Sequence, residues 1–200
     1  IDGFPAGVKI DKEYIESQLI RRRPKAAAYS TKRAEQDSPQ FLSGVSGGVT
    51  TGSPICVQLI NHDAVSADYD RDVFRPSHAD YTGYVRYKGF NDSRGGGHFS
   101  GRLTAPLVIA GSLCRSYIKE KYNTGIFSHI KSIGGIEDKS FSFSEKNIII
   151  NDFNFSGLEV FDKNAEKRMT ELIENTAKQG DSLGGAIECC ITGAHEGQLC

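Results

Sequence analysis

The sequence has no apolar run long enough to span a lipid bilayer and no pattern typical of a secretory signal peptide. It also lacks an excess of charge of one sign, because 24 Lys and Arg face 25 Asp and Glu and the formal net charge is −1. A chain without a basic excess has no general electrostatic attraction to nucleic acids or to anionic membranes. We therefore expect a cytoplasmic protein that binds neither nucleic acid nor membrane.

Cysteines at the spacing of a metal site or of a disulfide framework are also missing. The five cysteines are an odd number, and none forms a Cys-x-x-Cys pair: Cys56, Cys114, Cys189, Cys190 and Cys200. Cys189 and Cys190 are neighbours in an expected strand, so their side chains point to opposite faces and do not easily share a ligand. We expect reduced thiols, no disulfide scaffold and no metal site.

Length and composition indicate one globular domain, or at most two. The 200 residues are 38% hydrophobic and 24% charged. Capping residues and apolar residues at helical spacing predict helices at 11–22, 105–122 and 162–180. Apolar runs bounded by turn residues predict strands at 41–49, 54–60, 147–151 and 186–192, while 122–145 reads mainly as loop. The chain is therefore predicted to have an α+β fold.

Two of these elements carry a prediction about burial. The strand at 54–60 is apolar enough to be expected in the interior. The helix at 105–122 is predicted to turn one stripe toward the core: Leu107, Ala110, Leu113, Cys114, Tyr117 and Ile118.

The stretch from Phe74 to Thr104 concentrates residues that suit a site for an anion and for proton transfer. Gly95–Gly97 let the backbone turn sharply and approach a ligand closely, and the helix expected just after Thr104 offers free N–H groups for a phosphate. His78 and His98 can change charge near neutral pH. Taken singly, each residue has a commoner structural explanation, such as a hairpin turn or a structural histidine. Their combination favours a site.

A second basic stretch follows the first helix. Arg21–Arg23 lie at its C-terminal turn, where the helix dipole accounts for one or two cations but not for three, and Lys25, Lys32 and Arg33 follow. Lys32–Asp37 is expected to be a mixed-charge loop. An anion-binding patch and a solvated run of charges explain this segment about equally well.

Seven short motifs occur in one order along the chain: RRRP at 21–24, TKRAE at 31–35, SGV at 43–45, TTGSPI at 50–55, RPSHADY at 75–81, GGGHFSGR at 95–102 and GDSLGG at 180–185. Together they resemble the chorismate synthase family. The resemblance covers essentially all 200 residues but only part of a full-length member, because the N-terminal Gly-Glu-Ser-His-Gly segment and the C-terminal portion of the family are absent. We expect residues 1–200 to form part of a single domain.

The resemblance implies a layered β-α-β sandwich and a homotetramer. It implies a lyase that converts 5-enolpyruvylshikimate 3-phosphate to chorismate and phosphate by anti-1,4-elimination, the last common step of aromatic amino-acid biosynthesis. Reduced FMN is the implied cofactor, and it lends an electron and takes it back without net redox change. NADPH is one source of the reduced flavin, and an external reductant is the other.

The resemblance also implies roles for individual residues. His78 corresponds to a histidine that protonates the reduced flavin, and His98, Phe99 and Ser100 correspond to residues on the flavin, where many members have Arg-Ser-Ser. His98 and Phe99 are thus departures, as is Ala28, where many members carry an arginine.

The substrate carries a phosphate and two carboxylates, for which planar guanidinium groups are suited. Arg22, Arg33 and Arg102 are therefore the candidate substrate-binding residues, and with His78 they are predicted to converge on one pocket. Two other readings compete with the enzyme. One is a non-catalytic domain that binds polyanions through 21–33, and the other is a nucleotide-dependent oxidoreductase, which the glycine spacing disfavours.

Overall fold

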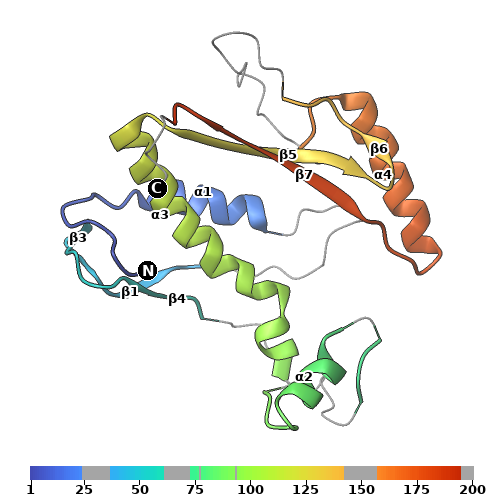
Figure 1. Cartoon of the computed structure of the whole chain (residues 1–200), viewed down its shortest axis with the longest axis horizontal. Coiled ribbons are helices and arrows are strands. Elements are labelled where there is room, and N and C mark those ends of the chain that lie inside the picture. Colours follow the sequence, from blue (N-terminus) through green and yellow to red (C-terminus); the bar gives the residue numbers. More distant parts are fainter. Residues whose placement is uncertain (24–36, 61–72, 77, 93, 142–156, 195–200) are drawn as a thin grey trace. The chain divides into compact units, whose positions relative to one another are not determined.

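The computed structural model describes residues 1–23, 37–60, 73–76, 78–92, 94–141 and 157–194. The chain divides into two compact units, with the described residues up to Cys114 in the first and those from Arg115 onward in the second (Figure 1). Each unit is described by itself. Both mix helices with small antiparallel sheets, so the predicted α+β class is confirmed.

In the first unit, helix α1 spans Lys12–Arg22, as the sequence predicts. Asp11 caps it, because its Oδ1 accepts a hydrogen bond of 2.9 Å from the backbone N–H of Tyr14. Ile15 and Leu19 are one turn apart and fully buried, which contributes roughly 1.5–3 kcal/mol for each side chain. This anchoring places the arginines of the last turn at a defined position.

The strands of the first unit are shorter than predicted. The segment expected as one strand forms β1, Gln40–Ser43, and a hairpin of β2, Val45–Ser46, with β3, Val49–Thr50. The interruption lies at Gly44, whose φ of +77° does not continue a strand.

The prediction of a buried second strand is also wrong. Strand β4, Cys56–Gln58, pairs antiparallel with β1, and its Cys56 and Gln58 are exposed. Only the preceding Ile55 is buried, so the inward side chain lies just outside the paired residues.

Three short helical segments lead into a long helix whose residues up to Cys114 belong to this unit. They are α2, Asp80–Arg86, and the 3₁₀ turns η2, Arg94–Phe99, and η3, Gly101–Leu103. The glycine run thus forms a 3₁₀ helix, in which Gly97 adopts a φ of +55°. Helix α3 follows as Thr104–Tyr122 and begins where the sequence predicts.

Helix α3 buries only part of the predicted stripe, since Leu113 is buried whereas most other members of the stripe are partly exposed. Ala105, Ile109, Ser112 and Leu113 are its buried residues, whereas Leu107 is 70% exposed. The first turns are apolar almost all round, so spacing alone does not distinguish the inward side from the outward side.

The second unit contains the three-stranded antiparallel sheet β6-β5-β7 and helix α4 (Figure 1). Strand β5 spans Gly125–Ile133, β6 spans Ile136–Glu137 and β7 spans Gly185–Thr192. The loop predicted for 122–145 is therefore wrong, while the strand predicted at 186–192 is confirmed. The strand predicted at 147–151 lies outside the described residues.

Helix α4 spans Lys163–Lys178 and is capped by Asp162, whose Oδ1 accepts from the N–H of Asn164 at 2.8 Å. Ala165 and Met169 are its buried residues. They pack with Leu158 and Val160, and partly buried isoleucines of the sheet and of the helix lie against them: Ile130, Ile133, Ile136 and Ile173. Cys190 is buried and Cys189 exposed, as adjacent strand residues require.

Candidate active site

Two of the predicted substrate-binding arginines meet on one buried carboxylate in the first unit. Arg22, at the end of α1, donates from Nη1 to Oδ2 of Asp37 at 3.1 Å. Arg102, in η3, donates from Nη1 to Oδ1 of the same carboxylate. We call Arg22, Asp37 and Arg102 the arginine cluster.

The arginine cluster is bound directly to the start of α3. Nε of Arg22 donates to Oγ1 of Thr104 at 3.0 Å, and its Nη2 lies 3.4 Å from the carbonyl oxygen of Gly101. Thr104 Oγ1 in turn donates to the Gly101 carbonyl at 2.7 Å. Ser100 caps η3 by accepting the N–H of Arg102 at 3.2 Å. The segment after the glycine run therefore fixes both arginines.

Burial differs sharply within the arginine cluster. The side chain of Asp37 is 1% exposed, whereas those of Arg22 and Arg102 are 20% and 18% exposed. Two positive charges against one negative charge leave the cluster with one net positive charge, and its solvent-exposed side chains are those of the two arginines. Such a surface attracts an anion, and a guanidinium can bind carboxylate or phosphate through two N–H groups.

Arg23 adds an unusual feature beside this cluster. Its Nε atom is buried and has no hydrogen-bond partner among the residues that the structure describes. A buried N–H without a partner is destabilising, and native structures contain few of them. The three consecutive arginines thus differ in environment. Arg22 belongs to the arginine cluster and Arg23 has a buried Nε, whereas Arg21 is exposed and donates to Gln18 at 2.8 Å.

Two of the three residues predicted to lie on the flavin, His98 and Phe99, form an aromatic group next to α2. The rings of His98 and Phe99 have centroids 4.1 Å apart and are tilted by 35°, and Nε2 of His98 lies 3.3 Å from the hydroxyl of Tyr87. A Cβ on Gly83 of α2 would lie 2.7 Å from the Phe99 ring, so the glycine lets this ring approach the helix. The Phe99 side chain is nevertheless 45% exposed, which leaves aromatic surface for a ligand.

His78 lies just before α2 and is exposed. Its Nδ1 is 2.9 Å from the carbonyl oxygen of Pro76. A carbonyl oxygen only accepts hydrogen bonds, so Nδ1 carries a proton and Nε2 is the atom that can exchange one. Nearby, Arg75 binds Asp80 through Nε at 2.8 Å and Nη2 at 2.9 Å, and this pairing lowers the pKa of Asp80 to about 2.

The structure brings together only part of the predicted site. Arg22 and Arg102 converge, and Ser100 adjoins them, whereas Arg33 lies outside the described residues. Within the described ranges, no hydrogen bond or ion pair links His78 to the arginine cluster. Asp37 was missed, because an acidic residue at the end of a mixed-charge loop has no distinctive spacing.

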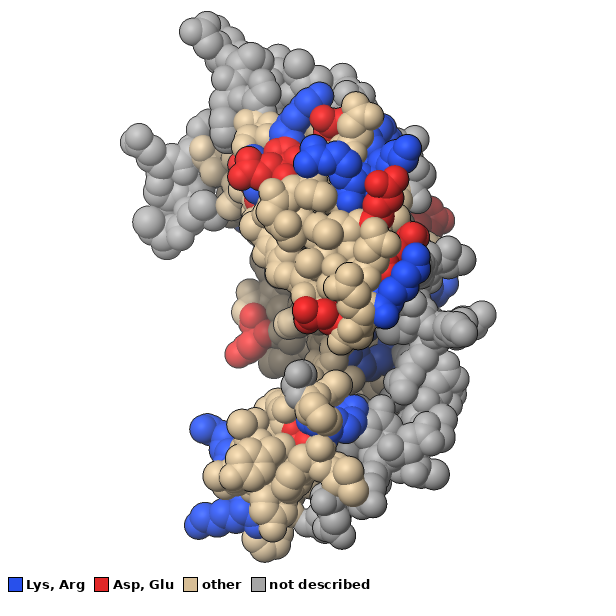
Figure 2. Space-filling view, turned by 90° about the vertical axis from the view of Figure 1, so that its right-hand side faces the viewer, with Lys and Arg blue, Asp and Glu red and all other residues tan. Residues whose placement is uncertain are grey.

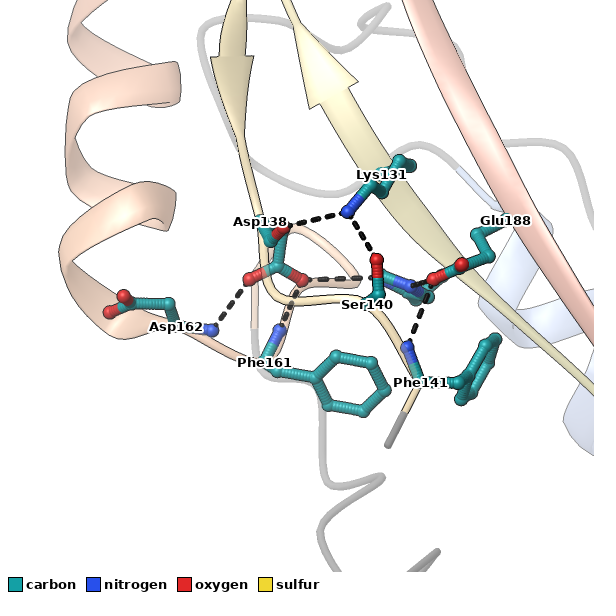
Figure 3. Close-up of polar contacts among 8 residues, drawn as sticks. Lys131, Asp138, Ser140, Phe141, Phe161, Asp162 and Glu188 are labelled. Atoms are coloured by element: carbon teal, nitrogen blue, oxygen red, sulfur yellow. Dashed lines mark hydrogen bonds and ion pairs between the residues drawn. The ribbon is translucent and has the colours of Figure 1, made fainter. Parts of the chain in front are cut away.

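Sequence reasoning also missed a buried polar cluster in the second unit (Figure 3). His129 on β5 is fully buried, with Nδ1 3.1 Å from Oδ2 of Asp138 and Nε2 2.8 Å from Oε2 of Glu188. The imidazole bond lowers the pKa of Glu188 most, against the opposing effect of burial. With no exposed ring surface, His129 is placed to stabilise the fold rather than to meet a substrate.

The N–H groups of two phenylalanine residues complete this cluster. Phe161 donates to Asp138 Oδ2 at 2.7 Å and Phe141 donates to Glu188 Oε2 at 3.1 Å. Their rings flank the imidazole, with centroids 4.4 Å and 4.8 Å from that of His129.

A cavity of about 510 Å³ lies beside the turn that precedes β7. Its lining includes apolar side chains such as Ile130, Ile173 and Leu183, together with the carboxylate of Asp181. An apolar surface with a negative charge disfavours a ligand with several anionic groups, so this cavity is not the candidate site.

The distribution of charge over one face of the molecule does not favour a polyanion-binding protein. Figure 2 shows both signs of charge interspersed over the upper part of one face, while the fewer charged side chains of the lower part are mainly basic. Mixed charge of this kind provides no broad basic track for a polyanion. No helix among the described residues has the length and apolarity needed to cross a membrane. The described residues also contain no group of three or more His, Cys, Asp or Glu side chains that could hold a metal ion.

Comparisons with known proteins point in one direction. Residues 1–198 match the model of the family described as chorismate synthase. The chain is 40% identical over 191 residues to the chorismate synthase of Dehalococcoides mccartyi, with 94% of this chain and 51% of the relative covered. It is 42% identical over 190 residues to the chorismate synthase of Pyrococcus abyssi, again with 94% and 51% covered.

A solved structure is similar as well. A crystal structure of chorismate synthase matches with a TM-score of 0.67 and 25% identity, covering 95% of this chain and 51% of that one. The chain thus spans about half the length of the relatives that it matches. This similarity confirms the fold predicted from the motifs, which is that of the chorismate synthases.

Proposed function

Because this chain belongs to the chorismate synthase family, we propose that it carries part of the site that converts 5-enolpyruvylshikimate 3-phosphate to chorismate and phosphate. The reaction is an anti-1,4-elimination, so the proposed enzyme is a lyase of the shikimate pathway. The family relatives are about twice as long as this chain, and the proposal therefore concerns the part of the site that these residues form.

The observation that carries the proposal is the meeting of Arg22 and Arg102 on Asp37. The substrate has a phosphate and two carboxylates, and the cluster keeps one net positive charge on two arginines whose side chains are partly exposed. Arg22 and Arg102 are proposed to bind substrate anions and so to orient the ring. Arg33 is proposed to join them on the strength of its motif alone.

Reduced FMN is the proposed cofactor, and the residues next to α2 fit it. His98 and Phe99 present exposed ring surface, and Gly83 leaves room for the Phe99 ring against the helix. Flat apolar faces next to polar groups are suited to an isoalloxazine ring. When bound, the reduced flavin supplies an electron-rich ring that lends an electron and regains it. Ser100 lies between this aromatic group and the arginine cluster and is proposed to contact the flavin.

His78 is the proposed catalytic residue, and its role is to deliver or hold a proton at Nε2. The Pro76 carbonyl fixes the proton on Nδ1, so the ring presents one defined nitrogen for exchange. Its exposure gives this nitrogen access to a ligand and to solvent protons. Asp80 is held by Arg75 and keeps the turn before α2 in place.

Assembly and supply of reduced flavin belong to the same proposal. We infer a cytoplasmic homotetramer. Its flavin is reduced either by NADPH on the protein itself or by an external reductant. Measuring NADPH oxidation by the protein with FMN separates these two routes.

The test is an anaerobic assay of a form of the protein as long as its relatives, with chemically reduced FMN and 5-enolpyruvylshikimate 3-phosphate. We expect chorismate and phosphate to appear in equal amounts, and no product with oxidised FMN. A folded preparation that binds reduced flavin but releases no phosphate would refute the proposed function. Strong salt-dependent binding of unrelated polyanions instead would favour a non-catalytic binding domain.

A further inference from the structure

We propose that Asp37 is a positioning residue that holds Arg22 and Arg102 together as one anion-binding unit. The identity of the anion rests on the proposed function, whereas the geometry of the unit does not. Asp37 does not itself meet the ligand, because its side chain is only 1% exposed.

The first argument is the way in which the carboxylate is shared. Oδ2 accepts from Arg22 and Oδ1 accepts from Arg102, so each oxygen serves one guanidinium. A carboxylate is rigid and planar, and bonding its two oxygens to two arginines fixes the distance between those arginines. The guanidinium groups come from α1 and η3, which lie far apart in the sequence and repel each other as like charges.

The second argument concerns the N–H groups of Arg22 that are left after its bonds within the protein are counted. Three of the five N–H groups of Arg22 donate to Asp37, Thr104 and Gly101. The other two have no partner among the described residues, and they belong to a side chain that reaches the surface. A guanidinium anchored in this way loses little conformational freedom when an anion binds, and preorganisation of this kind favours affinity.

The third argument predicts whether replacing Asp37 strengthens or weakens anion binding. Asp37→Asn removes one negative charge, so the net charge of the arginine cluster rises from one positive to two. If charge alone governed binding, this variant would bind anions more tightly. If position governs binding, it binds them more weakly, because an amide nitrogen cannot accept a hydrogen bond from an arginine.

The experiment measures the dissociation constant of 5-enolpyruvylshikimate 3-phosphate by calorimetry for wild type, Asp37→Asn, Arg102→Ala and the double variant, each at the length of its relatives. We expect Asp37→Asn to bind at least tenfold more weakly, with KM rising more than kcat falls. Arg102→Ala should add less than twofold in the Asp37→Asn background, because the two residues act as one unit. Tighter binding in Asp37→Asn, or independent effects of the two changes, overturns the proposal.

A second readout needs no ligand. The Nε–H of Arg22 donates to Thr104, and its exchange with solvent is measured by NMR. We expect at least tenfold faster exchange in Asp37→Asn, and unchanged exchange in the folded variant overturns the proposal. If wild type does not bind the enolpyruvyl substrate, the proposed function fails while this readout still decides the role of Asp37.

Two further variants control the comparison. Glu166→Gln removes a partly buried carboxylate in the second unit that accepts from Leu158 and Lys163, and it should leave ligand binding unchanged. If Asp37→Asn does not fold, Asp37→Glu keeps the charge but moves the carboxylate by one methylene group. Weaker binding by Asp37→Glu supports positioning, and binding equal to wild type overturns it.

Discussion

Replacing His129 by leucine should destabilise the second unit strongly. The imidazole is fully buried and lies between Asp138 and Glu188. Ionised carboxylates only accept hydrogen bonds, so the ring form that satisfies both has a proton on each nitrogen. Leucine fills a similar volume but donates nothing, and the Asp138 side chain, which is 0% exposed, is left as a buried charge without the ring.

The expected loss follows from that uncompensated charge. Removing one partner of a buried ion pair costs about 3–5 kcal/mol. Asp138 keeps the N–H groups of Phe161 and Asp162 at 2.7 Å and 2.9 Å, so the lower end of this range, about 3 kcal/mol, is expected. A loss of that size is a large part of the total stability of an ordinary domain.

Urea denaturation followed by far-ultraviolet circular dichroism at neutral pH measures this loss. Ser128→Ala is the matched control, because it changes the exposed neighbour on the same strand and should alter stability by less than about 0.5 kcal/mol. A loss below about 1 kcal/mol for His129→Leu, at an unchanged urea dependence, would show that the cluster is not a stabilising ion pair.

Further expectations concern pH, backbone and ligand. The pKa of Glu188 is lowered below its ordinary value of 4.5, so its contribution to stability is present above that pH and is lost as the pH falls through the folded-state pKa. The free energy of unfolding, measured by circular dichroism, should therefore fall more steeply with decreasing pH in wild type than in Glu188→Gln. Gly44→Ala should cost about 1–3 kcal/mol, because Gly44 has a φ of +77° and an added Cβ would lie 2.7 Å from a backbone atom. Gly48→Ala, with a φ of +80° and open space, should cost less, and equal urea midpoints for the two variants would exclude the clash. In single-turnover kinetics, His78→Ala should lower the rate by about 100-fold with little change in substrate affinity. Arg102→Ala should weaken substrate binding by about 10–100-fold in a titration, and an unchanged dissociation constant would remove Arg102 from the site.

The helices were predictable because their signals are local. Asp11 and Asp162 each cap the helix that follows them, and apolar residues at helical spacing mark the buried sides of α1 and α4. Such signals depend on neighbours within one turn, which a single sequence contains.

The strands and the inward side of α3 depend on partners distant in sequence. Strand β5 was read as loop because its residues mix polar and apolar types, yet it pairs along its length with β7. Residues that pair across the sheet, such as Ile126 and Ile191, are 65 positions apart, and no local pattern relates them. The exposure of Leu107 has the same origin, because burial is decided by what packs against the helix.

The candidate site, too, was predictable from sequence only in part. Arginines that suit acidic ligands are recognisable by type, and two of them do meet. The acidic residues that hold functional or structural groups were not recognisable, because Asp37 and Asp138 acquire their importance only from three-dimensional neighbours. Charge type is thus readable from sequence, while the pairing of charges is a property of the fold.

The arginine cluster also links ligand binding to folding. Asp37 lies 15 positions from Arg22 and 65 from Arg102, so the cluster forms only when those distant segments have come together. A ligand of the cluster therefore selects the folded first unit, and its binding energy adds to the free energy of unfolding of that unit. Raising the concentration of such a ligand from its dissociation constant to one hundred times that value would add about 2.3 kcal/mol. A ligand of the arginine cluster that is abundant in the cell would thereby protect the first unit from unfolding and proteolysis.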